Sequence, residues 1–111
     1  MIELDTTVGD GAAVIRPSGR LTMIVAPQLR TVITDTVASG RSRIVVDLSA
    51  CEFVDSSGLG ALIAGLKTAR QAGGDLRIAG VGPQIATVLQ LTNLDRVLRA
   101  HDTVGGAFSA G

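Results

Sequence analysis

RIVVDLSACEFVDSSGLGALIAGL, residues 43–66, joins an apolar strand to an amphipathic helix and decides the fold class of this chain. Its first part, 43–48, is β-branched and almost continuously apolar, which is typical of a central strand covered on both faces. The helix is expected to run to about Gln71 and to stop at Gly73-Gly74. Its apolar residues follow the i, i+3, i+4, i+7 spacing of a helix, and they are Leu59, Leu62, Ile63 and Leu66.

Strands and helices alternate on both sides of this stretch, as in proteins built around a parallel sheet. Two short strands, at 2–8 and 12–17, flank Gly9-Asp10-Gly11 and predict an opening β-hairpin. Further along, the pattern predicts a strand over 75–80 and a last short strand at Val97-Leu98. We therefore expect a single α/β domain whose mixed, mostly parallel sheet is opened by an antiparallel hairpin and carries about four helices.

Three more helices are expected besides the one after Gly58. The first has Pro27 in its opening turn and Gly40 just beyond its end. The second begins at Pro83 and ends near Asn93, and the last is a helical turn or two around 104–108. The residues expected to face inward from the helix at Pro83 are Ile85, Val88, Leu89 and Leu91. The residues expected to be largely buried overall are Leu29, Ile33, Val45, Leu48, Leu62, Ile63, Leu66, Ile78 and Leu89.

The composition argues against several classes of function. Ten basic residues balance ten acidic ones, and only Phe53 and Phe108 are aromatic, so no surface suited to phosphates and stacked bases is indicated. No apolar stretch approaches the roughly 20 residues of a membrane-spanning helix. The first residues read as a strand and not as a secretion signal, and Cys51, the only cysteine, allows no internal disulfide. We expect a cytoplasmic protein that neither binds nucleic acid nor inserts into membranes.

The candidate functional segment is Asp55-Ser56-Ser57-Gly58-Leu59-Gly60, at the junction of a strand and the longest helix. Sites in open α/β sheets collect at the carboxyl ends of strands. Two glycines leave the first helical turn without bulk, so that another protein could approach the backbone and both hydroxyls. A second interpretation stays open, in which the segment has only a structural role. Asp and Ser are preferred N-cap residues, and glycines also permit tight packing of a helix on a sheet.

Other chemistries find little support in the sequence. His101 is the only histidine, and no cluster of metal-ligating residues accompanies it. Neither serine of the segment sits in a Gly-x-Ser-x-Gly elbow. Gly80-Val81-Gly82-Pro83 lacks the lysine and third glycine of phosphate-binding loops and is better interpreted as a strand-to-helix turn. Asp47 and Asp55 form a carboxylate pair only by proximity in sequence. No cofactor, metal or catalytic residue is expected, and the protein is expected not to be an enzyme.

The segment VDSSGLGAL, residues 54–62, preceded by VVDLS at 45–49, resembles the signature of STAS domains, and specifically of bacterial anti-sigma-factor antagonists. The resemblance extends over nearly the whole chain, so that residues 1–111 are identified as a single STAS domain. SGRL at 18–21 resembles the loop after the hairpin of the family. GGDL at 73–76 resembles the entry to its short fourth strand, and VLQLTNL at 88–94 resembles its third helix.

The resemblance implies a phosphorylation switch. In the family, an anti-sigma factor that is also a serine kinase binds the unmodified protein and releases its sigma factor. The kinase phosphorylates the first serine of the motif, here Ser56, and the modified protein dissociates until a phosphatase resets it. The implied binding surface comprises Asp55, Ser56, Ser57, Gly58, Leu59 and Gly60 together with Thr22, Met23 and Ile24, and the implied outcome is regulation of sigma-factor-dependent transcription.

One feature departs from the family pattern. Members commonly carry an acidic residue shortly after the Gly-x-Leu of the loop, whereas here Gly19-Arg20-Leu21 continues as Thr22-Met23-Ile24-Val25. Met23 and Ile24 either contact a partner or enter the core, and the sequence leaves both open. The departure supports an alternative function, a STAS scaffold or transporter-accessory module without a phosphorylation cycle. A sensor of a small ligand is a third possibility, against which the neutral net charge and the lack of aromatic residues to line a groove argue.

Overall fold

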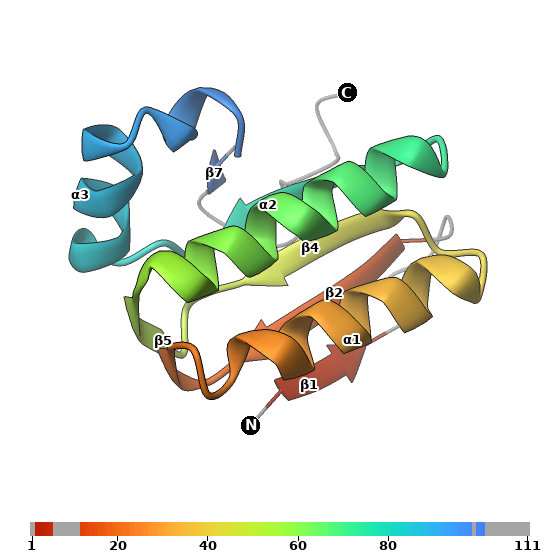
Figure 1. Ribbon diagram of the computed structural model, residues 1–111, viewed down its shortest axis with the longest axis horizontal. Helices are drawn as coiled ribbons and strands as arrows, with labels where there is room; N and C mark the ends of the chain where they lie inside the picture. The colour runs from red at the N-terminus through yellow and green to blue at the C-terminus, as the bar shows by residue number, and fades with distance from the viewer. Residues whose placement is uncertain (1, 6–11, 99, 102–111) are drawn as a thin grey trace.

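The computed structural model describes residues 2–5, 12–98 and 100–101, in which a mixed sheet carries helices on one face (Figure 1). The main sheet has five strands in the order β1-β2-β4-β6-β7, and only the β1–β2 pair is antiparallel. A separate two-stranded parallel sheet pairs β3 with β5. The strands are β1 (Ile2–Asp5), β2 (Ala12–Pro17), β3 (Gly19–Leu21), β4 (Arg43–Asp47), β5 (Cys51–Val54), β6 (Asp75–Ala79) and β7 (Ala100–His101).

Three α-helices and one 3₁₀ helix connect these strands. They are α1 (Ala26–Ala38), α2 (Ser56–Gln71), α3 (Pro83–Leu91) and η1 (Leu94–Arg96). Proline stands in the first turn of α1 and of α3, where its missing N–H leaves no hydrogen bond unmade. The expected α/β class and the antiparallel opening pair are therefore confirmed. The expected turn at Gly9-Asp10-Gly11 and the expected helical turn at 104–108 lie outside the described residues.

The two strands of the small sheet were not predicted from the sequence. β3 has three residues and β5 has four, too few for alternation to be recognised. They pair only with each other among the described strands. Their pairing places the loop after β3 beside the start of α2, because Leu21 is the register partner of Val54. This small sheet is what brings the two parts of the candidate site together.

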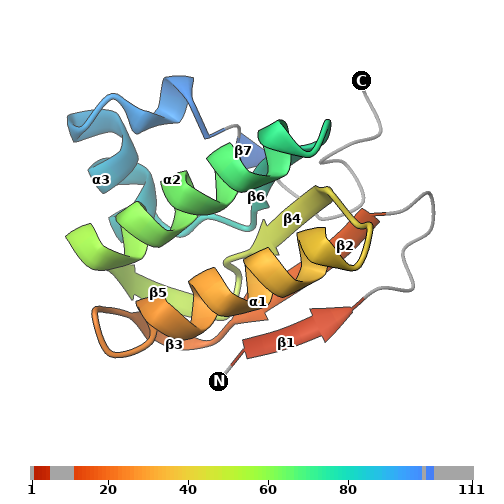
Figure 2. The ribbon, with the colours of Figure 1, turned by 45° about the vertical axis from the view of Figure 1, so that its right-hand side comes forward.

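Helices α1 and α2 lie side by side over one face of the main sheet (Figure 2). Gly65 of α2 allows their close approach, since a Cβ atom there would lie 2.6 Å from Cδ1 of Ile33 in α1. The buried side of α2 is consequently shifted toward α1 and includes the small residues Ala61 and Ala69. Ile63 lies on the flank of this buried side; it packs against the core but is only partly buried, which is less than expected. The other expected core residues are buried.

Two further expectations are corrected at the end of the chain. Leu91 is 79% exposed and does not face inward, because it is the last residue of α3 and the chain reverses at Asn93 with a φ of 59°. The expected strand at Val97-Leu98 lies instead at Ala100–His101, where it pairs with β6. Helix η1 follows α3, so the strand begins a few residues later than expected. Leu98 is nevertheless fully buried in the core.

Candidate functional site

Asp55 fixes the start of α2 and attaches it to the loop that follows β3. Its backbone is extended, with φ −104° and ψ −174°, and its Oδ1 accepts a hydrogen bond from the backbone N–H of Gly58 at 2.9 Å. Oδ2 accepts from the backbone N–H of Met23 at 3.2 Å, and the N–H of Asp55 donates to the carbonyl oxygen of Leu21 at 3.2 Å. Asp55 is thus an N-cap that also holds two segments far apart in the sequence.

The two serines after Asp55 have different surroundings. Ser56 is the first residue of α2 and is exposed, whereas Ser57 is partly buried on the side that faces α1. Gly58 is buried against the small sheet, and a Cβ atom there would overlap the carbonyl oxygen of Leu21 and lie 2.6 Å from Cγ2 of Val54. Leu59 is also buried, so its side chain belongs to the core. Ser56 is therefore the exposed serine of the pair, at the tip of the helix.

The loop Thr22–Val25 borders this helix start, because β3, which precedes the loop, pairs with β5, which precedes α2. It forms a tight turn in which the N–H groups of Val25 and Ala26 both donate to the carbonyl oxygen of Thr22, at 2.9 and 2.8 Å. Met23 is 66% exposed and Ile24 is 79% exposed. The alternative that they enter the core is therefore excluded. They form an apolar projection beside Ser56 and Ser57.

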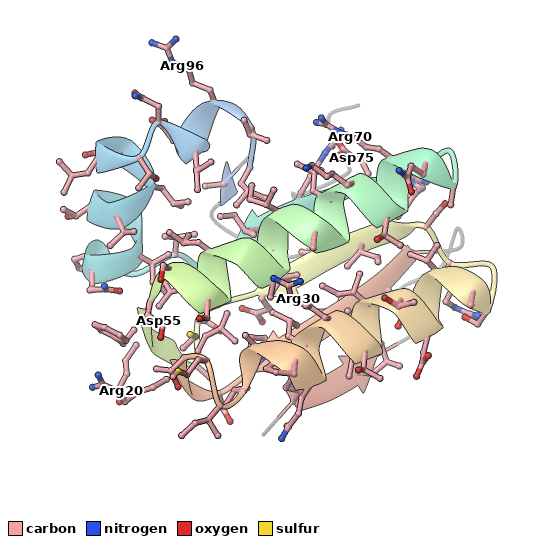
Figure 3. The ribbon with its side chains drawn as sticks, in the orientation of Figure 1. Arg20, Arg30, Asp55, Arg70, Asp75 and Arg96 are labelled. Atoms are coloured by element: carbon pink, nitrogen blue, oxygen red, sulfur yellow. The ribbon has the colours of Figure 1, made fainter. Side chains whose placement is uncertain are left out.

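Two arginines that sequence reasoning did not select also belong to this surface (Figure 3). The guanidinium carbon of Arg20 lies 4.2 Å from the ring centroid of Phe53, its register partner across the small sheet. Arg30 of α1, together with Ser57, Met23, Ala26 and Pro27, lines a hollow of about 290 Å³. Neither arginine has a local sequence signature. Both positions depend on pairing and packing between segments that are far apart along the chain.

The other sequence candidates have structural environments of their own. Asp47 does not pair with Asp55; its carboxylate accepts hydrogen bonds from Nε of Arg16 at 3.1 Å and from the N–H of Ser49 at 3.0 Å. Cys51 is buried, and burial raises the pKa of its thiol. Gly80 adopts a φ of +67° in the turn that leads to Pro83, as the strand-to-helix interpretation requires. Within residues 2–5, 12–98 and 100–101, no group of His, Cys, Asp and Glu side chains is placed to hold a metal ion.

The fold and this surface define a class of small α/β domain in which an exposed serine begins the helix after a short parallel strand. The chain belongs to the STAS domain family, whose model matches residues 3–107. It is 28% identical over 101 residues to the anti-sigma-B factor antagonist of Staphylococcus aureus, covering 91% of this chain and 94% of that protein. In the described part of the chain, none of the helices has the length and apolar character needed to cross a bilayer.

Solved structures agree with this assignment. An anti-sigma factor antagonist from Mycobacterium paratuberculosis superposes with a TM-score of 0.83 at 32% identity, over 99% of this chain and 93% of that one. The phosphorylated form of the Bacillus cell fate determinant SpoIIAA superposes with a TM-score of 0.71 at 22% identity, over 91% of each chain. The second likeness concerns the fold alone.

Proposed function

We propose that this chain is an anti-sigma-factor antagonist. It binds an anti-sigma factor that has serine kinase activity, and phosphorylation at Ser56 ends the binding and thereby regulates sigma-factor-dependent transcription. The observation that carries the proposal is the exposed Ser56 at the first position of α2, beside the exposed Met23 and Ile24. The names of the relatives from Staphylococcus aureus and Mycobacterium paratuberculosis support the same function.

The proposed binding surface is built from two segments held by one carboxylate. Asp55 accepts hydrogen bonds from both the loop and the first turn of α2, so the backbone that carries Met23 and Ile24 is held beside the start of the helix. Gly60 leaves the adjacent turn of α2 without bulk. Apolar side chains surrounded by polar groups are typical of the central part of a protein interface. A kinase domain bound here would have the serine hydroxyl within its reach.

The proposed switch is electrostatic and local. The kinase transfers the γ-phosphoryl group of ATP to Oγ of Ser56, which releases ADP and the hydroxyl proton. The phosphate adds about −1.5 to −2 charges. At the start of a helix in the free protein this charge is tolerated, whereas burying an incompletely paired ion in an interface costs several kcal/mol. SpoIIAA of Bacillus, which has this fold, is known in a phosphorylated form, so a phosphate is compatible with the fold. A phosphatase returns the protein to its binding form.

Calorimetric titration against each serine-kinase anti-sigma factor of the source organism tests the proposal. The unmodified protein and Ser56→Ala should bind, whereas Ser56→Asp and the phosphorylated protein should bind roughly a hundredfold more weakly or worse. Ser56→Ala should resist phosphorylation and Ser57→Ala should accept it. All variants should melt near the unmodified protein. If phosphorylation leaves the affinity within threefold, the switch is wrong.

A second function is a STAS scaffold or transporter-accessory module without a phosphorylation cycle. The observation in its favour is the loop Thr22–Val25, which lacks the carboxylate that is common in the family after the Gly-x-Leu. Incubation with each candidate kinase and ATP, followed by intact-mass measurement, separates the two functions. Phosphate on Ser56 supports the antagonist, and its absence with every kinase that binds supports the scaffold.

A further inference from the structure

Arg30 is an exposed cation on the surface that carries the serines. Arg16 and Arg70, by contrast, form ion pairs, with Asp47 at 3.1 Å and with Asp75 at 3.2 Å. Among the described residues, no hydrogen-bond or ion-pair partner is found for the guanidinium of Arg30. Its side chain reaches from α1 toward α2 (Figure 3). It is exposed, so its charge is available to a group that arrives at this surface.

The guanidinium of Arg30 lies close to Gly60 of α2. A Cβ atom at Gly60 would be 3.2 Å from Nη2 of Arg30, so the guanidinium rests against this part of α2. Gly60 is four residues after Ser56, and residues four apart on a helix are neighbours with Cβ atoms about 5–6 Å apart. The guanidinium is therefore one helical turn from Ser56. Arg30 also lines a hollow with Ser57, the residue after Ser56, so its long side chain lies close enough to turn toward a phosphate on Ser56.

We propose that Arg30 is the intramolecular counter-ion of the phosphate on Ser56. An arginine fork suits two phosphate oxygens, and such charge-assisted hydrogen bonds are stronger than neutral ones. In the unmodified protein the cation stays free on the binding surface. In the modified protein the phosphate binds it, so that one modification removes both a serine hydroxyl and a free positive charge from that surface. The inference rests on the proposed function, because it takes Ser56 as the modified residue.

The test places phosphoserine at position 56 during translation, by genetic code expansion, and requires neither kinase nor partner. Phosphorus NMR then follows the second phosphate pKa, which is about 6 when unperturbed. We expect this pKa to be about half a unit or more lower in the protein with Arg30 than in Arg30→Gln. Arg30→Lys should restore part of the difference, and about 0.5 M salt should reduce it. The Nε–H resonance of Arg30 should shift on phosphorylation.

Arg20→Gln is the matched control, because it removes an equal charge from the same surface while Arg20 lies over Phe53. The helix start acts equally in all variants, so the comparison isolates the arginine. Equal phosphate pKa values, within about 0.1 unit, in the parent protein and Arg30→Gln would overturn the assignment. An effect of Arg20→Gln as large as that of Arg30→Gln would do so too. Neither result depends on whether a kinase partner exists, so this inference and the proposed function can fail separately.

Discussion

Oδ2 of Asp55 accepts a hydrogen bond from the backbone N–H of Met23, with 3.2 Å between oxygen and nitrogen, although the two residues are 32 positions apart in the sequence. The other oxygen of the same carboxylate caps α2 through the N–H of Gly58 at 2.9 Å. One side chain therefore sets the position of the exposed loop relative to the helix that begins with Ser56. Changes at Asp55 should affect both segments at once.

Asp55→Ala should lower the free energy of unfolding by about 1–2 kcal/mol, because it removes the N-cap. Asp55→Asn should lower it less, since its side-chain oxygen can still accept the N–H of Gly58. The amide of Met23 should exchange faster with solvent in Asp55→Ala, and urea unfolding together with hydrogen exchange measures both effects. Thr34→Ala, at an exposed site of α1, is the control and should stay within about 0.5 kcal/mol. Unchanged exchange at Met23 would show that the bond does not hold the loop.

Gly58→Ala and Gly60→Ala should differ although both glycines lie in the first turns of α2. A Cβ atom at Gly58 overlaps a backbone oxygen of β3 that cannot move aside, so we expect a loss of about 1–3 kcal/mol. At Gly60 the nearest atom is the flexible end of Arg30, and replacing a helical glycine by alanine gains up to about 1 kcal/mol. Urea unfolding of both variants measures the contrast. Equal losses would mean that the two glycines share one role.

Leu62→Ala should destabilise the protein by about 2–5 kcal/mol, because Leu62 is fully buried between α2 and the sheet. Ile63→Ala should cost clearly less, since Ile63 is only partly buried and solvent can fill the space that it leaves. Thermal and urea unfolding of the two variants compare these positions directly. A larger loss of unfolding free energy for Ile63→Ala than for Leu62→Ala would mean that the buried side of α2 has been assigned wrongly.

Replacing both Met23 and Ile24 by serine should weaken binding of the anti-sigma factor at least tenfold and leave the melting temperature nearly unchanged. The reason is that both side chains are already exposed and contribute little to the core. Leu91→Ser is the matched control, because Leu91 is as exposed as Ile24 but lies at the end of α3. It should alter neither binding nor stability. Calorimetric titration and a melting curve for each variant give the comparison.

The protein should lose stability in acid partly through Asp47. Burial alone would raise the pKa of this carboxyl, but hydrogen bonds from Ser49 and Arg16 outweigh burial and hold the pKa below its ordinary value of 3.8. A lowered pKa stabilises the fold above about pH 3.8, and this contribution disappears as the pH falls through the folded-state pKa. Urea unfolding at pH 7 and at pH 3 should show Asp47→Asn losing less stability than the parent.

Some acid sensitivity should remain in Asp47→Asn. Burial alone would raise the pKa of Asp75 as well. Hydrogen bonds from the N–H of Leu76 and from Arg70 and Arg77 outweigh burial and hold this pKa below its ordinary value. The double variant Asp47→Asn/Asp75→Asn should therefore be less sensitive to acid than either single variant. An identical loss between pH 7 and pH 3 in the parent and the double variant would exclude both carboxyls as the cause.

The sequence by itself determined those features that local signals specify. Continuous β-branched residues identified the strand that became β4, and apolar spacing with two closing glycines identified α2. Asp before a small polar pair identified the helix start, because an N-cap needs only residues that are adjacent in the chain. The place of Ser56 at the start of this helix followed from these signals. Each signal depends on a few consecutive residues and can therefore be recognised without the tertiary structure.

Only the tertiary structure decided the composition of the surface around Ser56. Whether Met23 and Ile24 face solvent depends on the pairing of β3 with β5, which are too short to be recognised alone. The position of Arg20 over Phe53 follows from the same pairing, and that of Arg30 against Gly60 from the packing of α1 on α2. Periodicity specifies which side of one element is apolar, but not which residue of another element lies opposite. That choice is made by packing between distant segments, which leaves no local pattern in the sequence.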